Sequence, residues 1–242
     1  MIEIDDLTKS FKKNRVIDAL SASFSSTGVS VIVGTNGSGK TTLLNMLTNL
    51  LEADGGGIRI DGIPPGSQAY KSKFFYLPSD FYLPGYMTGK EYVQFVLSRY
   101  ETSEEGKAPL LMDLLDLADG QNKTIESYSF GMKKKIQIVA AIAANTDYII
   151  ADEIFGGLDF DTSLLVQELF AAVSTTKKVI IVSHERNTID RFSEDIRLMR
   201  QGSLVNFEGT PEELTDVIKQ EEVLREKLDI VSKHFMSTEI LL

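Results

Sequence analysis

The sequence predicts an α/β domain with a mainly parallel sheet, on two observations. Short apolar runs rich in β-branched residues lie at 29–33, 148–151 and 179–182, and each is too short to form an independent helix. Longer segments carry apolar residues three or four positions apart, which is the spacing of a helix with one buried face. Alternation of this kind is typical of parallel strands that are connected by helices.

The individual elements follow from local patterns. Leucines three and four positions apart predict a helix over 43–51, and apolar residues at every fourth position predict another over 162–173. The runs 196–199 and 204–207 flank the turn sequence Gln-Gly-Ser, which indicates an antiparallel hairpin. The sequence Thr-Pro-Glu-Glu at 210–213 predicts a helix start, because threonine caps a helix, proline suits its first position and the second glutamate closes a capping box.

The chain is expected to form one domain over 1–242 with a helical insertion. The stretch 81–145 lacks short β-branched runs and has helical spacings, so we expect an α-helical subdomain inserted into an α/β core made by 1–80 and 146–210. Residues 211–242 are expected to form a partly helical tail, as a packing element rather than a regulatory or dimer-stabilising one. The apolar residues expected to make its contacts are Leu214, Ile218, Leu224 and Leu228.

Composition narrows the function classes. The 242 residues contain 25 Lys and Arg against 35 Asp and Glu, a formal net charge of −10, which argues against a broad surface for nucleic acid or anionic lipid. There are no cysteines, so disulfides, thiolate nucleophiles and cysteine metal sites are excluded. The first residues lack the basic flank of a secretory signal, and no stretch reaches the roughly 18–20 apolar residues that span a bilayer. We therefore expect a soluble, cytoplasmic domain.

A glycine-rich segment at 34–41, Gly-Thr-Asn-Gly-Ser-Gly-Lys-Thr, matches the phosphate-loop pattern G-x-x-x-x-G-K-[ST] at every fixed position. Glycines let the backbone wrap closely around a triphosphate with its N–H groups inward, and the N-terminus of the next helix adds the positive end of its dipole. Lys40 is expected to reach the β- and γ-phosphates, and the Thr41 hydroxyl to ligate Mg²⁺. A chance match is the alternative, and the apolar run before the loop and the helical pattern after it argue against that. The expected nucleotide-binding residues here are Asn36, Gly37, Ser38, Gly39, Lys40, Thr41 and Thr42.

Polar residues at the ends of two other apolar runs complete the expected site. The run 148–151 leads into Asp152, expected to hold Mg²⁺ directly or through water, and Glu153, expected to polarise the attacking water. His184 follows the run 179–182 and is expected to reach the γ-phosphate or that water. The alternatives are a surface carboxylate pair that ends a strand and a structural histidine.

With these residues in this order, residues 1–210 resemble the ATP-binding subunit of an ATP-binding-cassette (ABC) transporter. The resemblance implies a P-loop NTPase (RecA-like) core with a small antiparallel β part and an inserted α-helical subdomain. It also implies that Phe11 stacks on adenine, for which ordinary core packing is the alternative. The matching segments are Phe11, Walker A (34–42), a signature (129–132), Walker B (148–153), a D-loop (156–159) and the switch residue His184.

The same resemblance implies a mechanism and partners. Two such subunits, identical or different, pair head to tail, and each ATP lies between Walker A of one and the signature of the other. Ser129 and Gly131 then contact the γ-phosphate of the nucleotide held by the partner, Asp159 lies at the seam, and Glu153 is the catalytic glutamate. Closure on ATP and reopening after hydrolysis drive a separately encoded transmembrane permease, which places the protein at the inner face of the membrane.

Two segments depart from the family pattern. The family signature reads Leu-Ser-Gly-Gly-Gln, whereas residues 128–132 read Tyr-Ser-Phe-Gly-Met, so only the serine and the second glycine agree. The family also places a glutamine after a Tyr-Leu-Pro-like run, where this chain has Ser79 and Asp80. Ser79 is shorter and is expected to reach the metal only through water, which predicts reduced basal hydrolysis or altered coupling. Substitution of the glutamine by Asp80 is the alternative. The lysines at 133–135 are interpreted as a solvated helix face rather than a nucleic-acid patch.

The leading interpretation is a transport ATPase subunit that exports a peptide, an antibiotic or another small substrate. The alternatives are a soluble ABC-type ATPase without a transport role and a nucleotide sensor with little hydrolysis. The single cassette and the acidic charge argue against the first alternative. Intact Glu153 and His184 argue against the second.

Overall fold

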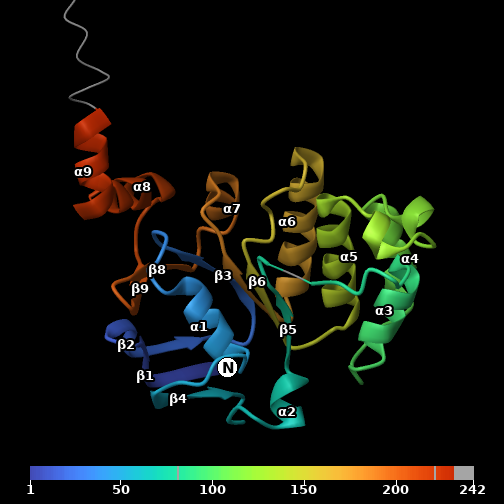
Figure 1. The fold of residues 1–242 in the computed structure, drawn as a ribbon, viewed down its shortest axis with the longest axis horizontal. Helices are drawn as coiled ribbons and strands as arrows, with labels where there is room; N and C mark the ends of the chain where they lie inside the picture. Colours follow the sequence, from blue (N-terminus) through green and yellow to red (C-terminus); the bar gives the residue numbers. More distant parts are fainter. Residues whose placement is uncertain (81, 221, 232–242) are drawn as a thin grey trace, which may run out of the picture.

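The computed structural model describes residues 1–80, 82–220 and 222–231, and its larger sheet has six strands in the order β5-β6-β7-β3-β8-β9 (Figure 1). The first five of these run parallel, and β9 pairs antiparallel with β8. The predicted α/β class with a mainly parallel sheet is therefore confirmed. The strands in spatial order are β5 (Phe74–Leu77), β6 (Tyr148–Asp152), β7 (Lys178–Val182), β3 (Gly28–Val33), β8 (Ile196–Arg200) and β9 (Ser203–Phe207).

A second sheet forms the small antiparallel β part. Its strand order is β2-β1-β4, with bounds β2 (Asn14–Phe24), β1 (Ile2–Phe11) and β4 (Gly55–Ile60). The register of β1 with β2 is interrupted by bulges, and Asp6 and Ala19 have the left-handed φ values of 46° and 46° that such bulges require. Apolar side chains of this sheet and of α1 share one core.

The parallel sheet separates two apolar cores, because alternate residues of its central strands point to opposite faces. In β3, Val31 and Val33 join the core that contains α5 and α6, whereas Ile32 joins the core that contains α1 and the antiparallel sheet. All five residues of β6 and all five of β7 are buried. The sheet is therefore held rigidly from both sides, and its carboxyl ends can position polar groups.

The helices cover these two faces. Between β5 and β6, the described residues form α3, α4, two short 3₁₀ turns and α5, without a strand. In Figure 1, α3 and α4 lie on the side of α5 away from the sheet. The bounds are α1 (Lys40–Leu47), α2 (Gln68–Lys71), α3 (Gly89–Leu97), α4 (Lys107–Leu114), 3₁₀ turns at Ala118–Gly120 and Ile125–Ser127, α5 (Phe130–Ala143), α6 (Phe160–Ser174), α7 (Arg186–Arg191), α8 (Pro211–Lys219) and α9 (Glu222–Val231).

Most expected elements are found where the local patterns placed them. The hairpin of β8 and β9 turns through Gln201 and Gly202, whose φ values of 48° and 78° suit a two-residue turn of the mirror-image type. Thr210 and Glu213 form the predicted capping box at the start of α8. The first predicted helix is too long, because α1 ends at Leu47 and the chain then turns through Asn49, which has a φ of 55°.

The C-terminal segment is partly described. Leu214 of α8 is buried in the core with α5 and α6, as expected of a packing element, and Ile218 packs against the same core. Leu228 of α9 is 42% exposed, so its expected contact is wrong. The side chain of Leu224 and residues 232–242 lie outside the described part. Within the described part, every helix is too short or too polar to cross a bilayer.

Candidate functional site

The phosphate loop joins the end of β3 to the start of α1. Gly37 and Gly39 have φ values of 82° and 107°, a conformation that glycine adopts without strain. Gly39 is the N-cap of α1, and it provides no side-chain capping hydrogen bond to this helix. The Ser38 hydroxyl is buried and has no hydrogen-bond partner within the described residues. A helix N-terminus without a side-chain cap, next to this hydroxyl, suits an anionic ligand.

Close packing holds the loop in place. A Cβ atom on Gly39 would lie 2.9 Å from Met199 Cε on β8 and 3.0 Å from Ile17 Cδ1 on β2. A Cβ atom on Gly34 would lie 2.8 Å from Ser38 Oγ. Because residues of both sheets pack against the loop, its backbone is pre-organised for a ligand.

Lys40 and Thr41 start α1 and point to different parts of the site. Lys40 Nζ donates to the carbonyl oxygens of Gly34 at 2.7 Å and Thr35 at 3.0 Å, so the ammonium lies over its own loop. Thr41 Oγ1 donates to Asp152 Oδ2 at 3.0 Å. Thr41 and Asp152 were both predicted to hold Mg²⁺, and the fold brings them together from α1 and β6.

Asp152 is the last residue of β6 and only 1% exposed. Its Oδ2 accepts from Thr41 and, at 3.4 Å, from Ser79 Oγ, whereas the buried Oδ1 has no partner within the described residues. Burial raises the pKa of this carboxyl above its ordinary value, and the Thr41 hydrogen bond opposes that shift. Hard oxygen ligands with a buried, unpartnered carboxylate oxygen fit Mg²⁺.

Ser79 follows β5 and lies at the predicted metal position, beside Asp152. Its contact is a long hydrogen bond of 3.4 Å to the same oxygen that Thr41 uses. Asp80, the next residue, is exposed. Ser79 is thus the residue from this connection that the structure places at Asp152.

Glu153 and His184 form a pair at the carboxyl ends of β6 and β7. His184 Nδ1 lies 2.9 Å from Glu153 Oε2, and the histidine side chain is 76% exposed. Glu153 has a left-handed φ of 50°, although its backbone N–H still bonds the carbonyl oxygen of Val182 at 3.0 Å. This unusual backbone turns the glutamate away from the strand direction, to where the histidine meets it.

The signature and the D-loop meet each other on a different part of the same chain. Ser129 caps α5 by accepting from the backbone N–H of Met132 at 3.2 Å, and a Cβ atom on Gly131 would lie 3.3 Å from the Gly157 carbonyl oxygen. Figure 1 shows β3 and β6 between α1, the helix that follows Walker A, and α5, the helix that the signature begins. Asp159 is largely exposed and caps α6 by accepting from the Thr162 backbone N–H at 2.9 Å.

Phe11 ends β1 and is 48% exposed. Lys9 Nζ lies 5.8 Å from the centre of its ring. Ordinary core packing, the alternative for Phe11, is therefore excluded. An exposed ring with an open face is compatible with stacking on a base.

Lys134 is the residue that sequence reasoning misjudged. It is 3% exposed, and the side chain of Lys135 is only 12% exposed, so the interpretation of 133–135 as a solvated face is wrong for both lysines. Its Nζ donates to the carbonyl oxygens of Glu153 and Gly156. One signal was available, because Ile138 and Ala141 follow Lys134 at four and seven positions on the same buried face of α5.

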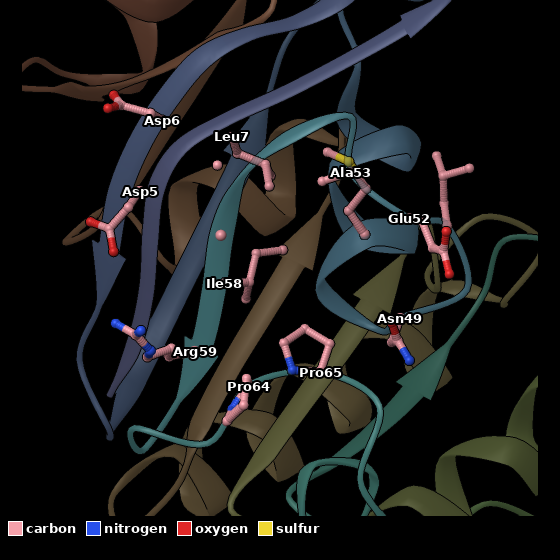
Figure 2. Close-up of a pocket in the computed structure, with 14 residues that line it drawn as sticks. Asp5, Asp6, Leu7, Asn49, Glu52, Ala53, Ile58, Arg59, Pro64 and Pro65 are labelled. Carbon is pink, nitrogen blue, oxygen red and sulfur yellow. The ribbon is translucent and has the colours of Figure 1, made fainter.

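A pocket of about 660 Å³ lies elsewhere, between β1, β4 and the C-terminal end of α1. Figure 2 shows Ile58 of β4 and Pro65 near it, with Asp5 and Arg59 at one side. Its lining contains none of the predicted nucleotide or metal ligands among the described residues.

Comparisons with known proteins agree with this geometry. The family model described as ABC transporter matches residues 17–156. An uncharacterized ABC transporter ATP-binding protein of Nostoc sp. is 31% identical over 180 residues, which cover 72% of this chain and 54% of that protein. The petrobactin import ATP-binding protein YclP of Bacillus subtilis is 28% identical over 233 residues, 92% of each chain.

A solved dimeric ATP-binding cassette, in a post-hydrolysis state with ADP and Pi, has the same fold. The TM-score is 0.75 at 23% identity, and the match covers 86% of this chain and 100% of that one. The family model covers more than half of the residues, and the phosphate loop, the Walker B carboxylates and the switch histidine stand at the carboxyl edge of one sheet. The chain therefore belongs to the ABC transporter family, as an ATP-binding subunit.

Proposed function

We propose that this subunit binds Mg²⁺ and ATP, pairs with a second ATP-binding subunit, and drives a separately encoded transmembrane permease. One observation carries the site assignment. Polar groups that follow β3, β6 and β7 meet at the carboxyl edge of the sheet. Thr41 Oγ1 donates a hydrogen bond to Asp152 Oδ2 at 3.0 Å. At the residues that follow, His184 Nδ1 lies 2.9 Å from Glu153 Oε2. Ligands of open α/β sheets bind at this edge.

Binding rests on the phosphate loop. The backbone N–H groups at the start of α1 and the buried Ser38 hydroxyl would hold the phosphates, and Lys40 would exchange its two carbonyl acceptors for phosphate oxygens. Thr41 and the Oδ1 atom of Asp152 would hold Mg²⁺, which neutralises charge that develops on the phosphates during transfer. Ser79 would contribute through water. The exposed ring of Phe11 would stack on adenine.

Hydrolysis rests on Glu153. Its carboxylate would accept a proton from the water that attacks the γ-phosphate, with Oε2 oriented by His184. Lys40 would stabilise the charge that builds up on the phosphate oxygens. Because the glutamate backbone leaves the strand conformation at this residue, its side chain is presented at the rim of the sheet rather than within the buried core.

Completion of the site needs a second subunit. Ser129 and Gly131 of one subunit would contact the nucleotide held by Walker A of the other, and Asp159, exposed at the start of α6, would lie at the seam. ATP would favour the closed pair, and hydrolysis would reopen it. This closing and reopening of the pair would drive the conformational change of the permease.

Export of a peptide, an antibiotic or another small substrate is the finer proposal. It rests on the departures from the family signature at 128–132. Import is its specific competitor, because YclP, a relative over 92% of each chain, is an import protein. In inside-out vesicles with the assembled transporter, external ATP should drive cargo inward for an exporter, whereas ATP-dependent loss of preloaded cargo would establish import.

The core proposal is tested with the purified subunit. Calorimetry should detect ATP binding in the presence of Mg²⁺, and ATP turnover should require Mg²⁺ and stop with EDTA. Co-purification with an integral membrane protein, rather than RNA, should distinguish a transport subunit from a soluble ABC-type ATPase. Absence of ATP affinity in the presence of Mg²⁺ would refute the proposal, and binding without turnover would favour a nucleotide sensor.

A further inference from the structure

A buried lysine ties three functional segments together. Lys134 lies on the first turns of α5, the helix that Ser129 of the signature caps. Its Nζ donates to the Glu153 carbonyl oxygen at 2.9 Å and to the Gly156 carbonyl oxygen at 2.5 Å. One side chain therefore connects the signature helix to the backbone of the catalytic glutamate and to the first residue of the D-loop.

The two carbonyl groups bracket a tight turn. Ile154 and Phe155, between them, are buried at 0% and 2% exposure, so this turn is fixed to the core by apolar packing. At its start, Glu153 holds the left-handed φ of 50°, which costs free energy for a residue with a side chain. A charge-assisted hydrogen bond to the carbonyl group of that strained residue favours the conformation that presents its carboxylate.

Phe130, which departs from the family signature, places its ring beside the lysine. Lys134 Nζ lies 5.2 Å from the centre of the Phe130 ring. The same ring occupies the space beside Gly157, where a Cβ atom would lie 2.7 Å from Phe130 Cε1. Phe130 thus packs the signature onto the D-loop and places its ring beside the Lys134 ammonium, where a cation–π contact stabilises the charge.

The electrostatic surroundings agree with this arrangement. Burial lowers the pKa of Lys134, and the carboxylates of Glu185, Glu153 and Asp152 act in the opposite direction. The Lys134 ammonium is thus a buried cation that interacts electrostatically with three carboxylates. Its burial cost is offset by hydrogen bonds to fixed carbonyl groups and by these charges.

We propose that Lys134 is a positioning residue for hydrolysis, which holds the Glu153 backbone and the D-loop in the arrangement that presents the catalytic carboxylate. This inference rests on the proposed role of Glu153. Lys134 acts through backbone carbonyl groups rather than on the nucleotide, so its loss should affect turnover more than ATP binding.

The test compares three variants of the full subunit in Mg²⁺-dependent ATP turnover and in ATP calorimetry. Lys134→Met keeps the length and cannot donate, and we expect kcat to fall about 100-fold, with KM and ATP affinity changed by less than about threefold. Lys134→Gln keeps a neutral donor and should restore kcat to within about tenfold of the parent. Lys133→Met, at the neighbouring and partly exposed position of the same helix, is the matched control and should stay within about twofold.

The outcomes separate this inference from the proposed function. A Lys134→Met kcat within threefold of the parent would overturn the positioning role, as would a Lys134→Gln kcat as low as that of Lys134→Met. If Lys134→Met does not fold, Lys134→Ala, which leaves room for water beside the two carbonyl groups, replaces it with the same expectation. Absence of turnover in the parent would instead contradict the proposed function. Parental turnover that Glu153→Gln abolishes, with Lys134→Met unaffected, would leave the function intact and remove only the role of Lys134.

Discussion

Asp152→Asn should make the metal-free protein more stable while it removes Mg²⁺-dependent activity. Asp152 is 1% exposed, and its Oδ1 has no hydrogen-bond partner within the described residues. The Thr41 hydroxyl bonds only the other carboxylate oxygen. An ionised group in this position is costly for the fold, and the amide keeps its shape without the charge.

The magnitude follows from that unpartnered oxygen. A buried polar atom without a partner costs about 1–3 kcal/mol, and the amide removes the charge but still buries a polar group, so we expect a gain of about 1 kcal/mol. In a domain of this size that gain corresponds to a rise in Tm of about 2–4 °C. Because burial raises the pKa of Asp152, the cost is absent below the ordinary pKa of 3.8, grows as the pH rises through the folded-state pKa, and is fully present at neutral pH.

Thermal unfolding at neutral pH, in EDTA and without nucleotide, measures this gain. Asp159→Ala is the control of opposite sign, because it removes the cap of α6 and should lower stability by about 1 kcal/mol. Addition of Mg²⁺ and ATP should raise the Tm of the parent by more than that of Asp152→Asn. An Asp152→Asn protein that melts below the parent in EDTA, or gains equally from Mg²⁺ and ATP, would refute the reasoning.

Three further substitutions test the other assigned roles. Glu153→Gln should retain ATP, lose turnover by about 10²–10⁴-fold and accumulate a dimer in ATP by size-exclusion chromatography; turnover at the parental rate would exclude Glu153 as the base. Lys40→Ala should lose ATP affinity in calorimetry before any other property, because it removes the cationic partner of the phosphates, and parental affinity would contradict this. Ser79→Gln should raise basal turnover or change its Mg²⁺ dependence, because the longer amide can reach the metal directly; an unchanged rate and Mg²⁺ titration would show that the serine does not limit hydrolysis.

The central strands were predictable from the sequence because a strand that is buried on both faces has consecutive apolar residues. Every residue of β6 and β7 is buried, and residues 148–151 and 179–182 within them read as uninterrupted apolar runs. The strands of the antiparallel sheet were not located one by one, although that sheet was implied by the family resemblance. In β1 and β2 the alternation of buried and exposed residues is broken by bulges at Asp6 and Ala19, which shift the period of two on which strand recognition depends.

The same distinction applies to the site. Asp152, Glu153 and His184 could be proposed because each lies at or just after the end of a recognisable strand, and parallel strands bring such positions to one edge. Lys134 could not be assigned to Glu153 in this way, because the contact joins residues 19 positions apart through the packing of α5 against the turn after β6. A lysine between two other lysines reads as solvated until the buried face of its helix is known.

One departure from the family signature, Phe130, contacts the D-loop directly. A phenylalanine replaces the glycine at position 130, and its ring fills the space that any side chain at Gly157 would need. A change at the signature is therefore accommodated by the D-loop of the same chain. Lys134, beneath that ring, bonds the carbonyl groups of Glu153 and Gly156, so the signature, the glutamate and the D-loop are held as one unit. A displacement of the start of α5 would thus also move the backbone of Glu153 in the same subunit, because Lys134 links the two.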